Sequence, residues 1–411
     1  MSALPLPSWL QGKPILLIVV GFTLAAALTF ALSLIIARLA PRWGLLDRPE
    51  PRRIHNRPTP RLGGIAIGAS FLVVSLLLFR PATAYEQTVY VGLMLGSILI
   101  VTVMALDDVR GLPPLLRLGV QTLAALIVMF PGGHGTLIEV LHNPLISANH
   151  SQTFLPLVLA VPFTWFWIVG MMNTINWVDG VDGLAGGVVT IAAVVMAAIS
   201  WILGQREVAV LCAVLAGATI GFLPLNWHPA RLFMGDCGAM FLGLALAVLS
   251  NVGGAKLATI LLLLGLPILD TARVIVRRLR KGRSPLHFDR SHLHHRLLIG
   301  GLTQRQIALL FYVVTAAFGG VTIVAASLQT RASVWAQHIR LFGRFTVAVG
   351  ELPTLLGLPL VLLVSVGIFA VATVRRRRSG LPPGASSSVL PQPPQPPSRL
   401  SPTASGSHPR P

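Results

Sequence analysis

The stretch NTINWVDGVDGLAGG, residues 173–187, lies between two apolar segments that are each long enough to cross a bilayer. Asn173, Asn176, Asp179 and Asp182 recur in it at every third position. A helix cap followed by a turn is the structural alternative, and it needs only one such residue. Four carboxylate or amide side chains beside lipid exceed that need, so they predict a polar reaction site at a membrane face.

The composition around this stretch is typical of an integral membrane protein. Hydrophobic residues make up 54% of the 411 residues and charged residues only 11%, and the mean hydropathy is +0.76. A soluble globular protein carries about 25% charged residues. Strand-period alternation is absent, which argues against a β-barrel. We therefore predict an all-α, polytopic membrane protein.

About eleven transmembrane helices are expected, because apolar windows of roughly 17 to 25 residues repeat along almost the whole chain. The first window is too long for the apolar part of a signal peptide, so it should remain in the mature protein. A short segment, 1–13, precedes the transmembrane domain, 14–376, and a disordered Pro- and Ser-rich tail, 377–411, follows it. The predicted spans are 14–39, 62–79, 87–106, 114–130, 153–172, 184–203, 207–223, 238–252, 256–276, 305–327 and 352–374.

The uneven distribution of positive charge predicts the orientation. The formal net charge is +19, and the Arg-rich segments are 38–61, 273–296 and 375–378. Cytoplasmic loops are enriched in Lys and Arg, so these segments should face the cytoplasm, with the N-terminus outside and the C-terminus inside. The loop 328–351 is the exception, since its three arginines would face outward.

Five polar clusters fall in loops that this orientation places on the cytoplasmic side, whereas the outer loops hold no dense motif. Scattered polar loops would divide between the two faces by chance, so the convergence predicts a common site. The clusters are HNRPTPRLGG (55–64), LDDVRG (106–111), NTINWVDGVDG (173–183), NWHPARLFMGDCG (226–238) and DRSHLHHR (289–296).

Several of these residues have both a structural and a functional interpretation. Asp107 and Asp108 could cap a helix end, or they could act together with cations or a metal. Arg117 could anchor its helix at the membrane surface, or it could hold a phosphate. Asp236 precedes a predicted helix whose first turn favours anions, and Phe233, three residues earlier, is either a core residue or a surface on which a nucleobase stacks.

The cluster DRSHLHHR allows two ligands. His292, His294 and His295 invite a zinc interpretation, but no cysteine lies near them to complete a closed set of ligands. A cationic, hydrogen-bonding patch for phosphate fits the adjacent Arg290 and Arg296 better. Solvated charge beside the membrane is the structural alternative.

Together, the motifs LDD, NxxNxxDGxDGLA, PAxxFMGDxG and HxHHR resemble those of the polyprenyl-phosphate N-acetylhexosamine-1-phosphate transferases, glycosyltransferase family 4. They occur in the family's order between about Asp47 and Arg296. The histidine segment resembles the WecA and TagO branch more than the related MraY enzymes.

By position, the resemblance implies a role for each matching residue. Asp107 and Asp108 match the catalytic aspartates, and Asp236 with Asn176 matches the site of Mg²⁺, for which Mn²⁺ is the alternative ion. Phe233 falls where the family stacks uracil. The matching substrate-binding residues are Arg57, Arg117, Asn173, Asp179, Asp182, Gly183, Leu184, Phe233, His294, His295 and Arg296.

The implied reaction is attack by undecaprenyl phosphate on the sugar-linked phosphorus of a UDP-sugar, giving undecaprenyl-diphosphate-sugar and UMP. UDP-N-acetylglucosamine (UDP-GlcNAc) is favoured, with another UDP-N-acetylated sugar or UDP-MurNAc-pentapeptide as alternatives. The product would initiate a cell-envelope glycan, such as lipopolysaccharide or teichoic acid, at the cytoplasmic face of the bacterial plasma membrane. The expected partners are the lipid, the nucleotide sugar and the bilayer, without nucleic acid, and a homodimer is left open.

The lipid phosphate should need no general base, because the second pKa of a phosphate monoester is about 6. We therefore expect Asp107 and Asp108 to position cations or the attacking phosphate. An ion-coupled transporter is the competing class, but its carboxylates would lie near the bilayer midplane rather than at helix ends. An inactive scaffold of the same fold is the second alternative, and the intact set of aspartates argues against it.

Overall fold

The computed structural model is described here for most of the chain. The described residues are 12–47, 58–131, 136–142, 152–252, 257–282, 292–330, 338–341, 345–348 and 352–378. The predicted tail, 377–411, therefore lies almost entirely outside the described residues, and so does Arg57.

Helices form most of the described chain. They are α1 (Pro14–Leu39), α2 (Gly63–Leu78), α3 (Ala84–Arg110), α4 (Pro114–Met129), α5 (Leu157–Val178), α6 (Leu184–Ile202), α7 (Arg206–Asn226), α8 (Gly235–Val252), α9 (Leu257–Leu263), α10 (Gly265–Arg280), α11 (Leu293–Ile299), α12 (Gln304–Gln329) and α14 (Leu352–Arg378), with a 3₁₀ helix, η2 (Ala40–Trp43), continuing α1. Three antiparallel strand pairs lie in the loops: β1 (Leu46–Asp47) with β2 (Thr59–Pro60), β3 (Val140–His142) with β4 (Gln152–Phe154), and β5 (His338–Leu341) with β6 (Phe345–Ala348).

Local sequence signals set many of the helix ends. Pro14 and Pro114 stand in the first turns of α1 and α4, where a missing N–H costs nothing. Thr83 and Glu86 form a reciprocal capping box at the start of α3. The same helix ends at Gly111, whose φ of 70° suits glycine. The local sequence therefore determines where α3 ends, and Asp107 and Asp108 lie in its last turn.

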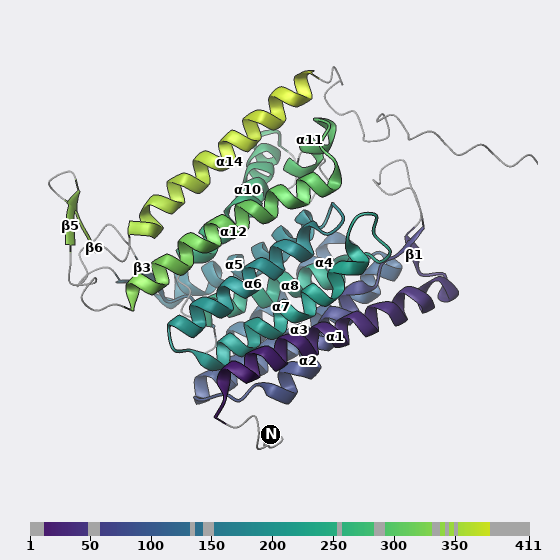
Figure 1. Ribbon diagram of the computed structural model, residues 1–411, viewed down its shortest axis with the longest axis horizontal. Coiled ribbons are helices and arrows are strands. Elements are labelled where there is room, and N and C mark those ends of the chain that lie inside the picture. Colours follow the sequence, from purple (N-terminus) through teal and green to yellow (C-terminus); the bar gives the residue numbers. More distant parts are fainter. Residues whose placement is uncertain are drawn as a thin grey trace, which may run out of the picture.

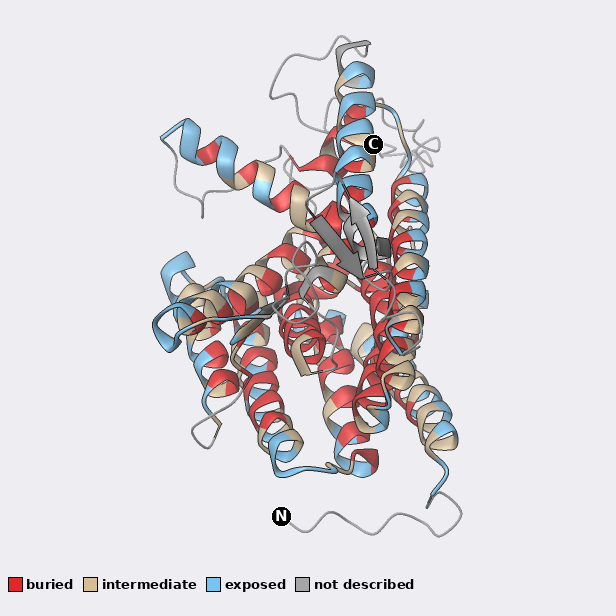
Figure 2. Ribbon diagram, turned by 90° about the vertical axis from the view of Figure 1, so that its left-hand side faces the viewer, coloured by how far each residue is buried: buried red, intermediate tan, exposed pale blue. Residues whose placement is uncertain are grey.

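The helices form a bundle with a dense apolar centre. The apolar stretches of α7 and α8 are 83% and 89% buried, whereas that of α1 is only 17% buried and lies at the edge of the bundle. Burial is greatest on the inner faces, and exposed residues lie on the outer sides of the peripheral helices (Figure 2). An exposed apolar outer surface around a buried core is what a protein surrounded by lipid requires.

Each of the eleven predicted windows contains a helix of the described chain. Seven of the described helices are long and apolar enough to cross a membrane, and three shorter apolar helices accompany them. The protein is therefore a polytopic membrane protein, while the count of eleven spans and the orientation remain predictions.

The ninth predicted window, 256–276, differs from the prediction because two helices, α9 and α10, replace the single span. Pro267 explains the break: it has no N–H to donate to the carbonyl of Leu263, one turn earlier. The chain turns at Leu264 and continues as α10, which carries Asp270 and a basic C-terminal end.

The two ends of the bundle differ in character. The strand pair β5–β6 lies with β3 at one end, beside the close of α12 and the start of α14 (Figure 1). The loops that follow α3, α5 and α7 and the short helix α11 lie at the other end, where hydrogen bonds connect their side chains. The predicted convergence of the polar motifs is thus confirmed for their described residues.

Candidate functional site

Asp236, in the first turn of α8, lies at the centre of the polar cluster. Its Oδ2 accepts a hydrogen bond of 2.8 Å from Arg117 of α4. Its Oδ1 accepts one of 3.0 Å from the Asn176 side-chain amide of α5 and a longer one of 3.5 Å from Arg61, which precedes α2. Four segments that are distant in sequence therefore meet at one carboxylate.

Arg117 connects Asp236 to the end of α3. Its Nε lies 2.9 Å from Oδ2 of Asp107, so one guanidinium bridges two carboxylates. Asp107 is only 3% exposed, and its Oδ1 accepts the backbone N–H of Leu112 at 2.5 Å. The Arg117 side chain is 34% exposed, so the cation forms the accessible part of this pair.

Asp108 has a different environment from Asp107. Its side chain is fully buried and accepts the backbone N–H groups of Asp236, at 2.8 Å, and Cys237, at 3.1 Å. These are unpaired donors at the N-terminus of α8, so Asp108 caps that helix from a distant segment. Gly235 has a φ of +75°, and a Cβ there would lie 2.4 Å from Asp108 Oδ2. Glycine therefore lets this carboxylate approach the helix.

The ladder of Asn173, Asn176, Asp179 and Asp182 divides among different partners. Steps of three residues rotate around a helix by about 60° each, so the side chains do not remain on one line. Asn173 donates a 2.9 Å hydrogen bond to Gln121 of α4, and Asn176 faces Asp236. The helix α5 ends at Val178, so the two aspartates belong to the following turn.

Asp179 carries the most perturbed carboxyl group of this turn. Burial raises the pKa of Asp179 well above its usual range, and the negative charge of Asp236 raises it further. For Arg61, burial lowers the pKa, but attraction by Asp236 and Asp108 outweighs it and raises the net value. Opposite and like charges therefore act on one another within a small, poorly solvated volume.

Asp182 organises the loop before α8. Its Oδ2 lies 2.7 Å from His228 Nδ1 and accepts the backbone N–H of Ala230 at 3.1 Å. The next residue, Gly183, has a φ of +77° and donates its N–H to the Asn226 side chain at 3.0 Å. These contacts position the chain from α7 to α8. Leu184, the first residue of α6, is buried.

Phe233 lies on that same loop, close to the start of α2. Its N–H donates to the carbonyl of Pro60 at 2.8 Å, and its carbonyl accepts the N–H of Gly63 at 2.9 Å. The backbone of Phe233 is thus fixed on both sides, while its side chain is half-buried. The fixed backbone thus positions Phe233 just before α8, three residues ahead of Asp236 in the sequence.

The histidines of α11 lie against the turn after α5. The ring of His294 is parallel to that of His292 within 9°, with centroids 5.7 Å apart, and lies 4.5 Å from that of His295. A Cβ on Gly180 would come within 2.6 Å of His294 Nε2, which shows how closely the turn and the imidazole pack. Burial, assisted by His295 and His292, lowers the pKa of His294 well below its usual range, so this imidazole is neutral at pH 7.

Asp270 holds this histidine segment in place. Both of its carboxylate oxygens accept the backbone N–H of Leu293 at 3.0 Å, and Oδ2 lies 3.0 Å from His292 Nδ1. The ring centroids of Trp177 and His292 lie 5.5 Å apart, and the Arg278 guanidinium lies over the Trp177 ring, 5.2 Å from its centroid. A buried carboxylate of α10 thereby caps α11.

Arg296 contacts the last helix. Its guanidinium donates to the Thr373 hydroxyl and lies 5.9 Å from the ring of Phe369, both on α14. The structure thus joins Arg296 to the last helix, whereas the other described candidates gather around Asp236, the turn after α5 or the loop before α8. The sequence did not reveal that α11 would direct its arginine and its histidines to different neighbours.

Two residues of the site were missed as candidates. Arg61 belongs to the cluster HNRPTPRLGG, but by itself it could not be distinguished from an ordinary positive loop residue. Asp270 lies within the apolar window 256–276, where a carboxylate is costly unless it has a function or a partner. That signal was present in the sequence and could have identified Asp270.

The charges of the cluster suit a divalent cation. Asp107, Asp108 and Asp236 pair with two guanidinium groups, those of Arg61 and Arg117, which leaves an excess of one negative charge. The raised pKa of Asp179 keeps that carboxyl group from adding a full second charge. Carboxylate and amide oxygens are the ligands that Mg²⁺ prefers. Within the described residues, no three His, Cys, Asp or Glu side chains form a group that could hold a metal ion, and the Asp236 oxygens face the guanidinium groups of Arg61 and Arg117.

Comparison with known proteins gives a consistent result. The model of glycosyl transferase family 4 matches residues 90–254. A probable undecaprenyl-phosphate N-acetylglucosaminyl 1-phosphate transferase of Bacillus subtilis is 31% identical over 324 residues, 77% of this chain and 86% of that protein. A decaprenyl-phosphate N-acetylglucosaminephosphotransferase of Mycolicibacterium smegmatis is 35% identical, covering 72% and 79%. An undecaprenyl-phosphate alpha-N-acetylglucosaminyl 1-phosphate transferase of Salmonella typhi is 30% identical, covering 70% and 78%.

Proposed function

Because the chain belongs to glycosyl transferase family 4, we propose that it transfers N-acetylglucosamine 1-phosphate from UDP-GlcNAc to undecaprenyl phosphate. The products are undecaprenyl-diphosphate-N-acetylglucosamine and UMP. The observation that carries the proposal is the meeting of Asp107, Asp236, Arg61, Arg117 and Asn176 at one end of a membrane-embedded bundle. The relatives whose names contain this reaction support the choice of the sugar.

The two arginines compensate charge where the phosphates meet. Phosphoryl transfer depends chiefly on alignment and electrostatic stabilisation, because several negative charges come together. The side chains of Arg61 and Arg117 are each 34% exposed, whereas the carboxylates beside them are buried. An incoming phosphate group therefore reaches the guanidinium groups before it reaches a carboxylate.

A divalent cation completes the charge balance of this proposal. The excess negative charge of the cluster would repel a diphosphate and a lipid phosphate, and Asp236, with Asn176 beside it, is the residue we assign to Mg²⁺. Bound there, the ion supplies Lewis-acid stabilisation of phosphoryl oxygens. The chain's own contribution is to hold these oxygens within a rigid helix start and to exclude water from the buried carboxylates.

Asp108 acts in this proposal as a positioning residue. Its two oxygens accept backbone N–H groups at the start of α8, which fixes the direction of the Asp236 side chain. The lipid phosphate is already largely ionised at neutral pH, because its second pKa is about 6. The reaction therefore proceeds without a carboxylate base at this position.

We place the reaction at the cytoplasmic face of the bacterial plasma membrane, where it initiates a cell-envelope glycan. The support is the positive charge at the end of the bundle that carries the carboxylates, with Arg42, Arg110 and Arg280 exposed there. An ion-coupled transporter is not favoured, because the described aspartates gather at helix ends rather than at the middle of the spans.

The experiment that tests the proposal incubates membranes containing the full-length protein with labelled UDP-GlcNAc and undecaprenyl phosphate. We expect a labelled lipid diphosphate-sugar, stoichiometric UMP, and loss of both after chelation of divalent cations. Asp236→Asn should lower the rate by at least about 10²-fold, the usual cost of removing one major electrostatic group. Glu207→Gln, at the far end of α7, is the matched control. Product formation from UDP-MurNAc-pentapeptide but not from UDP-GlcNAc would refute the proposed substrate.

A further inference from the structure

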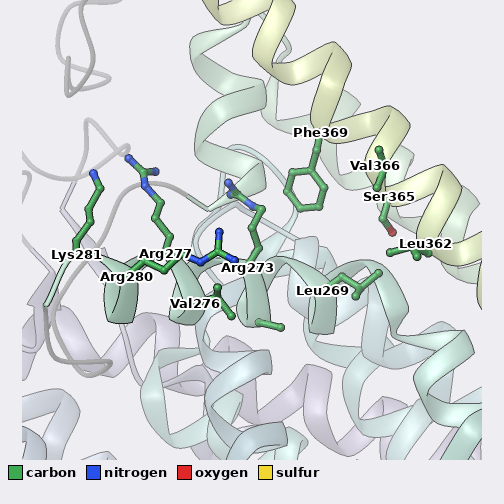
Figure 3. Close-up of a pocket in the computed structure, with 11 residues that line it drawn as sticks. Leu269, Arg273, Val276, Arg277, Arg280, Lys281, Leu362, Ser365, Val366 and Phe369 are labelled. Carbon is green, nitrogen blue, oxygen red and sulfur yellow. The ribbon is translucent and has the colours of Figure 1, made fainter.

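A groove separates α10 from α14 near the polar end of the bundle. Its volume is about 580 Å³. One part of its lining is apolar, and the other is a row of cations on α10 (Figure 3). The apolar residues are Leu269, Val276, Leu362, Val366 and Phe369, and the basic residues are Arg273, Arg277, Arg280 and Lys281.

The outer cations of the groove lack compensating charge. Arg277, Arg280 and Lys281 are exposed and extend from α10 at the end of the groove away from Leu269 (Figure 3). No ion pair joins any of the three to a carboxylate in the part of the chain that the structure describes. Three uncompensated positive charges at the edge of an apolar groove predict an anionic ligand with a hydrophobic part.

A polar atom inside the groove supports a ligand site. Ser365 is 2% exposed and lines the groove from α14, and its Oγ has no hydrogen-bond partner among the described residues. An unpaired buried hydroxyl is costly, so a ligand group that hydrogen-bonds to Ser365 would stabilise this part of the groove. Nearby, the guanidinium of Arg273 lies 4.5 Å from the Phe369 ring, where the basic and apolar parts of the groove meet.

The groove is separate from the carboxylate cluster. The opposite face of α10 is buried, since Asp270 binds His292 and Arg278 covers Trp177. That buried face contacts the start of α11, whose His294 packs against Gly180 in the turn after α5. None of the residues that line the groove is a hydrogen-bond partner of Asp236, whose partners include Arg61, Arg117, Asn176 and Asp108.

We propose that the groove binds an anionic phospholipid of the bilayer, with its phosphate against Arg277, Arg280 and Lys281 and an acyl chain along Leu362 and Val366. Charge complementarity selects this occupant. A neutral lipid would leave the cations uncompensated, and free phosphate would leave the apolar wall uncovered. The site is additional to the transfer reaction and does not depend on it.

The test measures lipid retention by native mass spectrometry of the full-length protein in detergent with added phosphatidylglycerol, phosphatidylcholine or undecaprenyl phosphate. Arg277→Gln with Arg280→Gln removes two cations, and Val366→Trp fills the groove without changing charge. The matched controls are Arg38→Gln with Arg42→Gln, two exposed arginines at the end of α1, and Val371→Trp, an exposed α14 residue outside the groove.

We expect the wild type to retain phosphatidylglycerol in preference to phosphatidylcholine. Arg277→Gln with Arg280→Gln should weaken that retention about thirtyfold, given the usual contribution of each basic residue beside an anionic lipid. Val366→Trp should also weaken it, because the indole occupies the space of the acyl chain, while both controls retain it. Three results would each overturn the proposal: equal retention of the two phospholipids, retention unchanged in both groove variants, or loss of undecaprenyl phosphate alone. Displacement of the phospholipid by inorganic phosphate at equal concentration would also contradict it, because the apolar wall would then contribute nothing.

Discussion

At the scale of single residues, adjacent aspartates in the sequence have different surroundings. Asp107 pairs with Arg117, whereas Asp108 accepts two backbone N–H groups from the start of α8. The two carboxylates point in different directions because successive residues of a helix are separated by about 100° of rotation. A shared motif therefore contains one residue that pairs with Arg117 and another that holds the start of α8 in place while it lies 3.5 Å from Arg61.

Substitution of Asp108 by Asn should affect both stability and activity. The amide oxygen can replace one acceptor, but the NH₂ group cannot accept the second backbone N–H, and an unsatisfied buried donor costs about 1–3 kcal/mol. We expect a lower thermal midpoint in detergent, and an activity loss that is the same at pH 6 and pH 9. Recovery of activity at pH 9 with an unchanged midpoint would show instead that Asp108 serves as a base. Glu207→Gln should leave both measurements unchanged.

Substitution of Asp270 by Ala should weaken substrate binding more than turnover. The carboxylate caps α11 and fixes His292, so its loss releases the segment that carries His294 and His295. A lost N-cap costs about 1 kcal/mol, which corresponds to a several-fold rise in KM for the nucleotide sugar. Steady-state kinetics that separate KM from kcat check this, with His292→Gln expected to give a smaller rise. A fall in kcat at constant KM would contradict the positioning role.

At the scale of elements, glycine determines how closely helices approach. Gly217 and Gly221 of α7 are four residues apart and face α1, where a Cβ on either would lie 2.2 Å from a backbone oxygen, that of Phe22 or Ala26. Small residues at this spacing let two membrane helices pack backbone against backbone. The peripheral helix α1 is therefore attached through a contact that no larger side chain fits. Pro267 has a comparable local effect, because its missing N–H interrupts the helix between α9 and α10.

Replacing both α7 glycines with leucine should detach α1 from the bundle. Overpacking of a close helix contact costs about 1–3 kcal/mol per site, and here the displaced atoms belong to backbone. We expect Gly217→Leu with Gly221→Leu to lower the thermal midpoint and to broaden the size-exclusion profile in detergent. Gly320→Leu on α12 is the control, because a Cβ there meets nothing within 4 Å. Equal behaviour of the two variants would show that this contact does not determine stability.

At the scale of the whole molecule, the polar motifs gather at one end of a bundle whose sides expose apolar residues. Carboxylates, arginines and histidines from separate loops share that end, and the strand pairs β3–β4 and β5–β6 lie at the other (Figure 1). A reaction between a water-soluble nucleotide sugar and a lipid headgroup requires polar groups gathered at one membrane face in this way. The lipid can remain in the bilayer while its phosphate reaches the helix ends.

Cysteine labelling in sealed right-side-out vesicles can test which side of the membrane each end of the bundle faces. Ala82→Cys and Phe154→Cys lie at the strand-pair end, and Arg42→Cys and Arg280→Cys lie at the carboxylate end; all four positions are exposed. An impermeant maleimide should label the first pair directly and the second only after permeabilisation. The native cysteines are buried, so their background should be low. Labelling that mixes the two groups would contradict a shared cytoplasmic site.

The sequence by itself determined the class of protein, the position of most helices and the motifs that carry polar chemistry. The length of an apolar segment, a helix cap and an uneven distribution of charge are local signals, so each can be recognised without knowing which distant residues lie nearby. Only the tertiary structure decided that Asn173 pairs with Gln121 while Asn176 faces Asp236, and that Arg61 and Asp270 belong to the site. It also directed Arg296 to α14. The physical reason is that the partner of a polar side chain is set by the rotation and packing of helices far apart in the chain, which no local pattern encodes.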